Sequence, residues 1–241
     1  MNCRNYLFSH PHVLLLGDIN MDLLKFKVHS GTAEFVDTLL TNDFSPIITV
    51  PSRITSRSST LIDHVYLYPG KKYLWWDSNI KSGNILSDIT DHLPKFIFNT
   101  ADSFCDTLFA DYLVSLKGSV QSDCLNFKYY TESEFSNQFH SYPTSVDISV
   151  LHMNIRSLNS KVRSFCQFIH LLDYMFDVIV LSEVWAYKID YRNSLPVYEF
   201  YYNLPIDSKV GGVGIFVRNC YSVQLFFFSI WSCIEKQSNR N

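Results

Sequence analysis

The residues of this sequence that are best suited to chemistry stand at the ends of apolar, strand-like runs. Each run is followed or interrupted by a carboxylate, an amide or an imidazole. Singly they have ordinary explanations, because an aspartate after a strand is often a turn former and a lone histidine is often structural. The residues concerned are Asp18, Asn20, Asp63, Asp91, His92, Asn154 and Glu183.

As a set, these side chains are suited to phosphoryl chemistry that depends on a divalent cation. Glu183 offers carboxylate oxygens, the kind of ligand that Mg²⁺ and Mn²⁺ prefer. Asp63 could orient His92 and balance its charge, as carboxylates do for catalytic imidazoles. Asp18 could position or deprotonate a water molecule.

Two asparagines belong to the same pattern. The amides of Asn20 and Asn154 could donate hydrogen bonds to a phosphate or hold the water shell of the metal. If several of these strand ends meet at one edge of a sheet, their side chains come together. The sequence therefore predicts a metal-dependent hydrolytic site at such an edge.

Strands and helices that alternate along the chain predict a layered α/β domain to hold these residues. Helical spacing of apolar residues predicts helices at 32–40 and 157–174, and a further helix is expected near 107–116. A hairpin is expected at 222–234. Apolar runs predict strands at 13–16, 47–50, 61–67, 96–98, 148–153, 178–181 and 212–217. By composition the chain divides into 1–98, a polar linker at 99–147, and 148–241.

Composition and charge exclude several classes of protein. Hydrophobic residues make up 47% of the 241 residues, which excludes wholesale disorder. The net charge of −3 counts against tight, unaided binding of nucleic acid, since such binders are usually basic. None of the six cysteines forms a C-x-x-C pair, so a zinc site is unsupported. We expect no membrane span, no secretory signal, and an intracellular location, nuclear or cytoplasmic.

Seven segments together resemble the endonuclease/exonuclease/phosphatase superfamily, and specifically the apurinic-type endonuclease domain of non-LTR (LINE) retrotransposons. Each segment alone is weak, but the combination is specific and covers most of the chain outside the linker. The segments are VLLLGDIN at 13–20, PSRIT at 51–55, STLIDHV at 59–65, SDITDHLP at 87–94, SVLHMNIRSLNSK at 149–161, and FDVIVLSEVW at 176–185, followed by GGVGIFV at 211–217.

The resemblance implies a four-layered α/β sandwich, in which two packed mixed β-sheets are flanked by helices. It also implies Mg²⁺- or Mn²⁺-dependent cleavage of DNA, with reverse transcription left to a separately encoded protein. Glu183 matches the family's metal-binding glutamate and Asn154 the asparagine that accompanies it. The implied catalytic residues are Asp18, Asn20, Asp63, Asp91 and His92. The candidate DNA contacts are Arg53, Thr55, Thr60 and Arg156, for which a solvated loop is the alternative explanation.

The order of the segments departs from the family. The half that is C-terminal in the family, 1–98, comes first here, and the N-terminal half, 148–241, comes last. A central strand that carries an active-site tyrosine is not found. Three alternatives therefore stand: an active endonuclease, an inactive remnant that binds DNA or protein weakly, and a phosphatase of the same superfamily. The linker is long enough to close the halves on each other or to exchange them in a domain-swapped homodimer.

Overall fold

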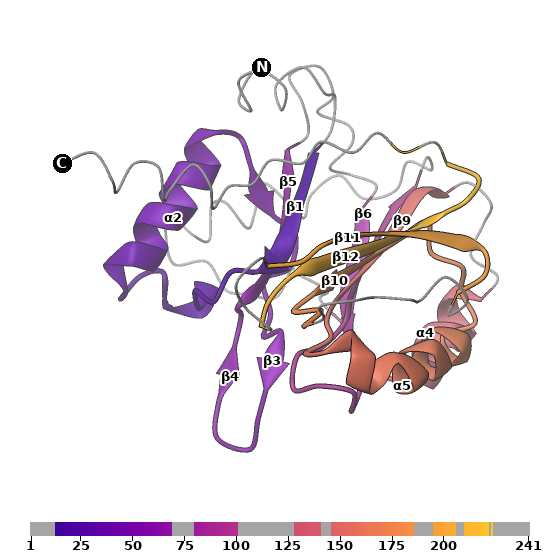
Figure 1. The fold of residues 1–241 in the computed structure, drawn as a ribbon. Coiled ribbons are helices and arrows are strands. Elements are labelled where there is room, and N and C mark those ends of the chain that lie inside the picture. The colour runs from indigo at the N-terminus through magenta and orange to yellow at the C-terminus, as the bar shows by residue number, and fades with distance from the viewer. Residues whose placement is uncertain are drawn as a thin grey trace.

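The computed structural model describes residues 13–68, 80–100, 128–140, 146–185, 195–205, 210–221 and 223 (Figure 1). Most of its strands form one mixed sheet of seven strands. Two neighbouring pairs, β9 with β10 and β6 with β8, are parallel, and the others are antiparallel. The strands, in spatial order, are β11 (Tyr198–Asn203), β12 (Val213–Arg218), β10 (Val178–Ser182), β9 (Val146–Asn154), β7 (Lys95–Thr100), β6 (Ile80–Ile85) and β8 (Lys128–Tyr130).

A smaller antiparallel sheet and a hairpin accompany the large sheet. The smaller sheet has the order β1 (Val13–Asp18), β5 (Asp63–Tyr68) and β2 (Ser45–Pro46). The hairpin consists of β3 (Arg53–Ile54) and β4 (Ser59–Thr60). The helices are a 3₁₀ turn, η1 (Leu23–Lys25), and three α-helices, α2 (Ser30–Thr41), α4 (Glu132–Phe139) and α5 (Leu158–Leu171).

Alternation along β7 shows how the layers are stacked. Phe96 and Phe98 pack in the core that contains the buried residues of α4 and α5, whereas Ile97 packs with Val65 and Leu67 of the small sheet. Successive strand residues point to opposite faces, so the large sheet lies between these helices and the small sheet.

Alternation along β5 places the remaining helix. Tyr66 and Tyr68 point away from the large sheet and pack with Phe35 and Leu39 of α2. The chain is therefore an α/β sandwich with the layers α2, small sheet, large sheet, and α4 with α5 (Figure 1). This confirms the predicted α/β sandwich, although the small sheet is antiparallel where a mixed sheet was expected.

Most of the predicted elements that fall on described residues are present, with ends that differ by a few residues. The predicted helix at 157–174 is Leu158–Leu171, and its buried face includes Phe165 and Phe168. The predicted strand at 47–50 was wrong, because Ile47 and Ile48 fill the core between the sheets outside any strand. Strands β6, β8 and β11 were not predicted. The predicted helix at 107–116 and hairpin at 222–234 lie outside the described residues, Val223 excepted.

The predicted linker at 99–147 needs a correction, because its described part belongs to the core. Strand β8 pairs with β6, and helix α4 begins at a capping box formed by Thr131 and Glu134. Phe135 and Phe139, one helical turn apart, are fully buried against the large sheet. Two aromatic residues in an otherwise polar segment are enough to anchor a helix.

The two halves of the chain, 1–98 and 148–241, share one sheet. Strand β7 of the first half pairs along its length with β9 of the second. Among the described residues, β1 pairs with β5 alone.

None of the helices in the described ranges has both the length and the apolar character needed to cross a membrane.

Candidate functional site

The space between the two sheets changes from apolar to polar at one end. Leu14 and Leu16 of β1 point into the apolar layer. Asp18 lies two residues further along the same strand, so its side chain points to the same face. By the same alternation Asp63 shares a face with Val65. The polar residues that occupy this end of the inter-sheet layer are Asp18, Asp63, Lys95, His152, Asn154 and Ser182.

Asp63 and His92 form a buried pair at the centre of this layer. Nδ1 of His92 lies 3.0 Å from each carboxylate oxygen of Asp63, and both side chains are almost inaccessible. The hydroxyl of Ser52 donates to Oδ2 of Asp63 at 2.8 Å and accepts from the backbone N–H of the same residue. These contacts fix both the position of the carboxylate and the plane of the imidazole.

Lys95 supplies an ammonium group to the same carboxylate. Its ammonium is fully buried, 3.2 Å from Oδ2 of Asp63, and donates to the carbonyl of Leu93 at 2.5 Å. Burial alone would raise the pKa of Asp63, but the charge of Lys95 and the hydrogen bond from His92 lower it well below the ordinary value. Asp63 is therefore held as a carboxylate.

Asp18 faces a different environment. The amide of Asn154 donates to its Oδ2 at 2.9 Å, and the backbone N–H of Asn20 donates to its Oδ1 at 2.9 Å. Burial and repulsion by Asp63 raise the pKa of Asp18, and Glu183 adds to this shift. A carboxylate with a raised pKa, aimed at a cluster of polar groups, is suited to accept a proton.

A chain of ion pairs borders this cluster. Asp91 accepts from Nε of Arg53 and from Nη1 of Arg156, each at 2.6 Å. Nε of Arg156 lies 3.8 Å from Oε2 of Glu183. Burial acts to raise the pKa of Asp91, but the hydrogen bond from Arg53 and the charges of both arginines outweigh it, so this pKa is lowered.

Left-handed backbone conformations gather at the same end of the sheets. Five of the seven non-glycine residues with positive φ among the described residues follow β1, β9 or β10. Such conformations cost about 1 to 3 kcal/mol each and often mark functional sites. The five are Asn20 (φ 56°), Arg156 (44°), Ser157 (83°), Glu183 (54°) and Trp185 (48°).

Three side chains of the site, those of Asp18, Asp63 and His92, are close enough together to hold a metal ion. One potential ligand atom from each of Asp18, Asp63 and His92 lies within 4.8 Å of the other two. The nitrogen of His92 nearest the carboxylates is Nδ1, which already contacts Asp63. Glu183 stands outside this group but is near enough to act on the charge of Asp18.

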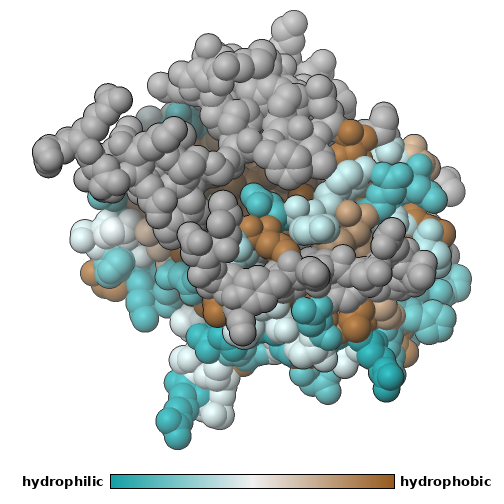
Figure 2. All heavy atoms as spheres, in the orientation of Figure 1, coloured by the Kyte–Doolittle hydropathy of each residue, from teal (hydrophilic) through white to brown (hydrophobic). Residues whose placement is uncertain are grey.

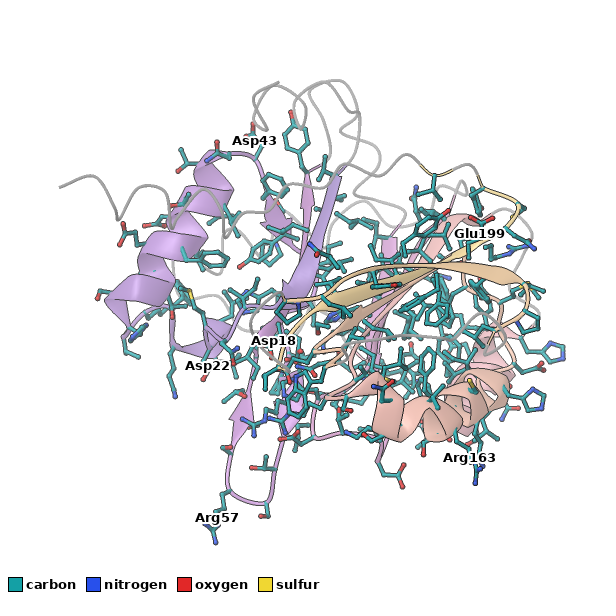
Figure 3. The ribbon with its side chains drawn as sticks, in the orientation of Figure 1. Asp18, Asp22, Asp43, Arg57, Arg163 and Glu199 are labelled. Atoms are coloured by element: carbon teal, nitrogen blue, oxygen red, sulfur yellow. The ribbon has the colours of Figure 1, made fainter. Side chains whose placement is uncertain are left out.

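The hairpin β3–β4 projects from the body next to the site (Figure 1). In Figure 3 Asp18 lies at the end of β1 nearest the base of the hairpin, and Arg57 lies at its far tip. Thr55 closes the turn, since its hydroxyl bonds to Ser58 and accepts from the N–H of Arg57. The space-filling view shows the hairpin as a hydrophilic finger (Figure 2).

The structure brings most of the predicted site residues together and leaves three apart. Those at the cluster or its border are Asp18, Asp63, Asp91, His92, Asn154, Glu183, Arg53 and Arg156. Asn20 contacts Asp18 through its backbone while its side chain is exposed. Thr55 and Thr60 lie along the hairpin.

Sequence reasoning missed five residues of the site, namely Ser52, Thr90, Lys95, His152 and Ser182. Ser52 and Thr90 stand in segments already noted, but a hydroxyl beside an aspartate carries no signal of its own. Thr90 bonds to the carbonyls of His92 and Asn154 and so ties the two halves together. Lys95 did carry a signal, because it is a charged residue at the start of the apolar run 96–98.

Comparison of this chain with protein-family models, with curated proteins and with solved structures found no significant match.

Proposed function

We propose that this chain is a divalent-cation-dependent phosphodiesterase that cleaves DNA. The observation that carries the proposal is the pair Asp63–His92 beside Asp18, at a site where Asn154 and Glu183 also converge. An oriented imidazole, a carboxylate with raised pKa and a further carboxylate together suit hydrolysis of a phosphate ester. The likeness of the sequence segments to retrotransposon endonucleases supports the same proposal.

Carboxylate oxygens suit Mg²⁺ or Mn²⁺, so such an ion would bind near Glu183. Asp18 and Glu183 repel each other at this end of the site, and a cation between them would relieve that repulsion. Glu183 would be its main ligand, with Asn154 adjacent. When bound, the cation would stabilise the negative charge that develops on the phosphate.

The remaining roles follow from the hydrogen bonds. Asn154 holds Asp18 so that its carboxylate can take a proton from the attacking water. Asp63 orients His92, whose Nε2 lies 4.0 Å from Oδ1 of Asp91 and would contact the phosphate or the leaving oxygen. Arg53 and Arg156 at the border would pair with flanking phosphates.

DNA is preferred over a small phosphate ester because of the hairpin. It extends the hydrophilic surface away from the site and ends in the exposed Arg57 (Figures 2 and 3). A long polyanion can contact the site and the hairpin together, whereas an inositol phosphate would reach the site alone.

The test is nicking of supercoiled plasmid by the purified chain with Mg²⁺. We expect nicking by the wild type and its loss in Glu183→Ala and in His92→Ala. Two exposed residues on helices serve as matched controls, Glu34→Ala and His170→Ala, and these should nick as the wild type does. Inactivity of a folded wild type, or unchanged nicking by Glu183→Ala, would contradict the proposal. An inositol phosphate assayed in parallel separates the phosphatase alternative.

A further inference from the structure

A buried lysine lies behind the catalytic pair, where the fold would ordinarily place an apolar side chain. Lys95 is the first residue of β7. Because residues two apart on a strand point to the same face, its side chain lies on the same face as that of Ile97, which packs in the apolar layer between the sheets. It is fully buried. A buried ammonium is costly unless it is paired, and its partner here is Asp63, also fully buried.

The contacts of Asp63 leave little room for a metal ion. Its Oδ2 accepts from Ser52 at 2.8 Å and lies 3.2 Å from Nζ of Lys95. His92 approaches both oxygens at 3.0 Å through Nδ1. That nitrogen can offer a lone pair to a cation only by giving up its proton, and the charge of Lys95 beside Asp63 disfavours a second cation there.

The neighbour of Lys95 across the sheet does not supply a competing charge. Lys95 is paired in register with His152 of β9, which is fully buried. The imidazole of His152 carries no negative charge, and its Nε2 lies 3.3 Å from Oγ of Ser182. Burial lowers the pKa of Lys95, and the adjacent carboxylate of Asp63 opposes that shift by stabilising the ammonium on its core side.

We propose that Lys95 is a built-in cation of the site. Its charge keeps the carboxylate of Asp63 paired with His92 and prevents a divalent ion from binding to the group Asp18, Asp63 and His92. Divalent cations are thereby confined to the other end of the site, near Glu183. This inference rests on the proposed function for the place of that metal ion. Lys95 acts through Asp63 and is a positioning residue.

The experiment is a Mn²⁺ titration of the full chain, followed through the electron paramagnetic resonance signal of free Mn²⁺. The test variant is Lys95→Gln, which removes the charge but keeps a hydrogen-bond donor. We expect one Mn²⁺ per wild-type chain and a second Mn²⁺ in Lys95→Gln. The second ion should bind roughly tenfold or more tightly than any second ion on the wild type, because a nearby positive charge has been removed. Lys95→Met should behave in the same way if it folds.

Two further variants separate the possible causes. The double variant Lys95→Gln with His92→Ala should not bind the second ion. This result would assign that ion to the group Asp18, Asp63 and His92, because a general change in electrostatic potential would not require His92. Co²⁺ in place of Mn²⁺ should give additional visible d–d absorption from a second bound ion in Lys95→Gln, and this addition should be absent from the wild type. A folded Lys95→Gln that binds Mn²⁺ as the wild type does would overturn the inference. Glu183→Ala reports separately on the proposed function, since unchanged Mn²⁺ binding by this variant would refute the metal assignment whatever Lys95→Gln does.

Discussion

The side-chain amide of Asn154 donates a hydrogen bond of 2.9 Å to Oδ2 of Asp18, a residue 136 positions away in the sequence. The bond joins the end of β9 to the end of β1, and so joins the large sheet to the small one. The candidate site is therefore a product of sheet packing and does not exist within either half of the chain alone.

Replacement of Asn154 by alanine should impair the site more than the fold. The variant loses the donor that orients Asp18, so we expect nicking to fall by about 10²-fold, as for removal of one oriented donor. The free energy of unfolding should fall by about 1 to 3 kcal/mol, because Oδ2 of Asp18 loses a partly buried hydrogen bond. Plasmid nicking and urea denaturation measure the two effects. Unchanged nicking would remove Asp18 from the proposed mechanism.

Helix α4 should be as important to stability as a core helix. Phe135 is fully buried among aromatic rings, with the ring of Phe96 at 5.0 Å and that of Phe139 at 4.9 Å between centroids. Phe135→Ala should therefore lower the free energy of unfolding by about 3 to 5 kcal/mol. Asn137→Ala, exposed on the same helix, is the control and should change it by less than about 0.5 kcal/mol. Equal, small effects would mean that the segment is a linker after all.

The buried His152 should make the fold sensitive to acid. Its pKa is lowered to about 3 in the folded chain, by burial first and then by Lys95, against about 6.5 when unfolded. Between these values the unfolded state binds the extra proton, so stability present at neutral pH is lost as the pH falls from 6.5 toward 3. The slope should reach at most ~1.4 kcal/mol per pH unit from this residue.

Urea denaturation at several pH values, in the presence of a chelator, tests this dependence. His152→Leu should flatten the slope between pH 6 and 4, because a leucine cannot be protonated. His64, another buried histidine whose pKa is lowered by burial, should leave part of the slope in place. A slope that His152→Leu does not alter would assign the acid sensitivity to other groups.

The tip of the hairpin should contribute to the affinity for DNA without contributing to stability. Arg57→Ala removes an exposed guanidinium, so one fewer phosphate should be neutralised when DNA binds. The slope of the logarithm of the binding constant against the logarithm of the salt concentration should therefore be less steep by about one. Arg163→Ala, exposed on α5 and far from the hairpin in Figure 3, is the matched control. Equal salt slopes for both variants would place the DNA elsewhere. The free energy of unfolding should change by less than about 0.5 kcal/mol in either variant.

The amino-acid pattern was sufficient to predict the layers and the polar ends of their strands. Apolar runs and the helical spacing near Phe165 are local properties, and they predicted a layered α/β domain and its helix at 157–174, whereas the sandwich was implied by the resemblance. The sequence placed Asp63 within the apolar strand 61–67 and His92 shortly before the run 96–98, and in the structure Asp63 is the first residue of β5. The sequence could not predict their distance of 3.0 Å, which depends on how β5 and the loop before β7 are packed.

Short polar segments were less predictable, and helix α4 shows why. Its burial depends on Phe135 and Phe139, and two aromatic residues in a polar stretch do not distinguish a packed helix from a loop. Strand β6 is similar, because Lys81, Ser82 and Asn84 interrupt its apolar pattern while its partners β7 and β8 supply the hydrogen bonds. Both elements are stabilised by residues distant in sequence.

By itself, the sequence determined which residue types end each strand, and therefore the kind of chemistry that the site can support. Only the tertiary structure decided which of them meet, because the contacts among Asp18, Asp63, His92 and Asn154 cross two sheets. The tertiary structure also decided that Lys95, a residue with no motif of its own, pairs with Asp63. The physical reason is that a buried charge is stable only beside an opposite charge, and the sheet packing alone brings the two together.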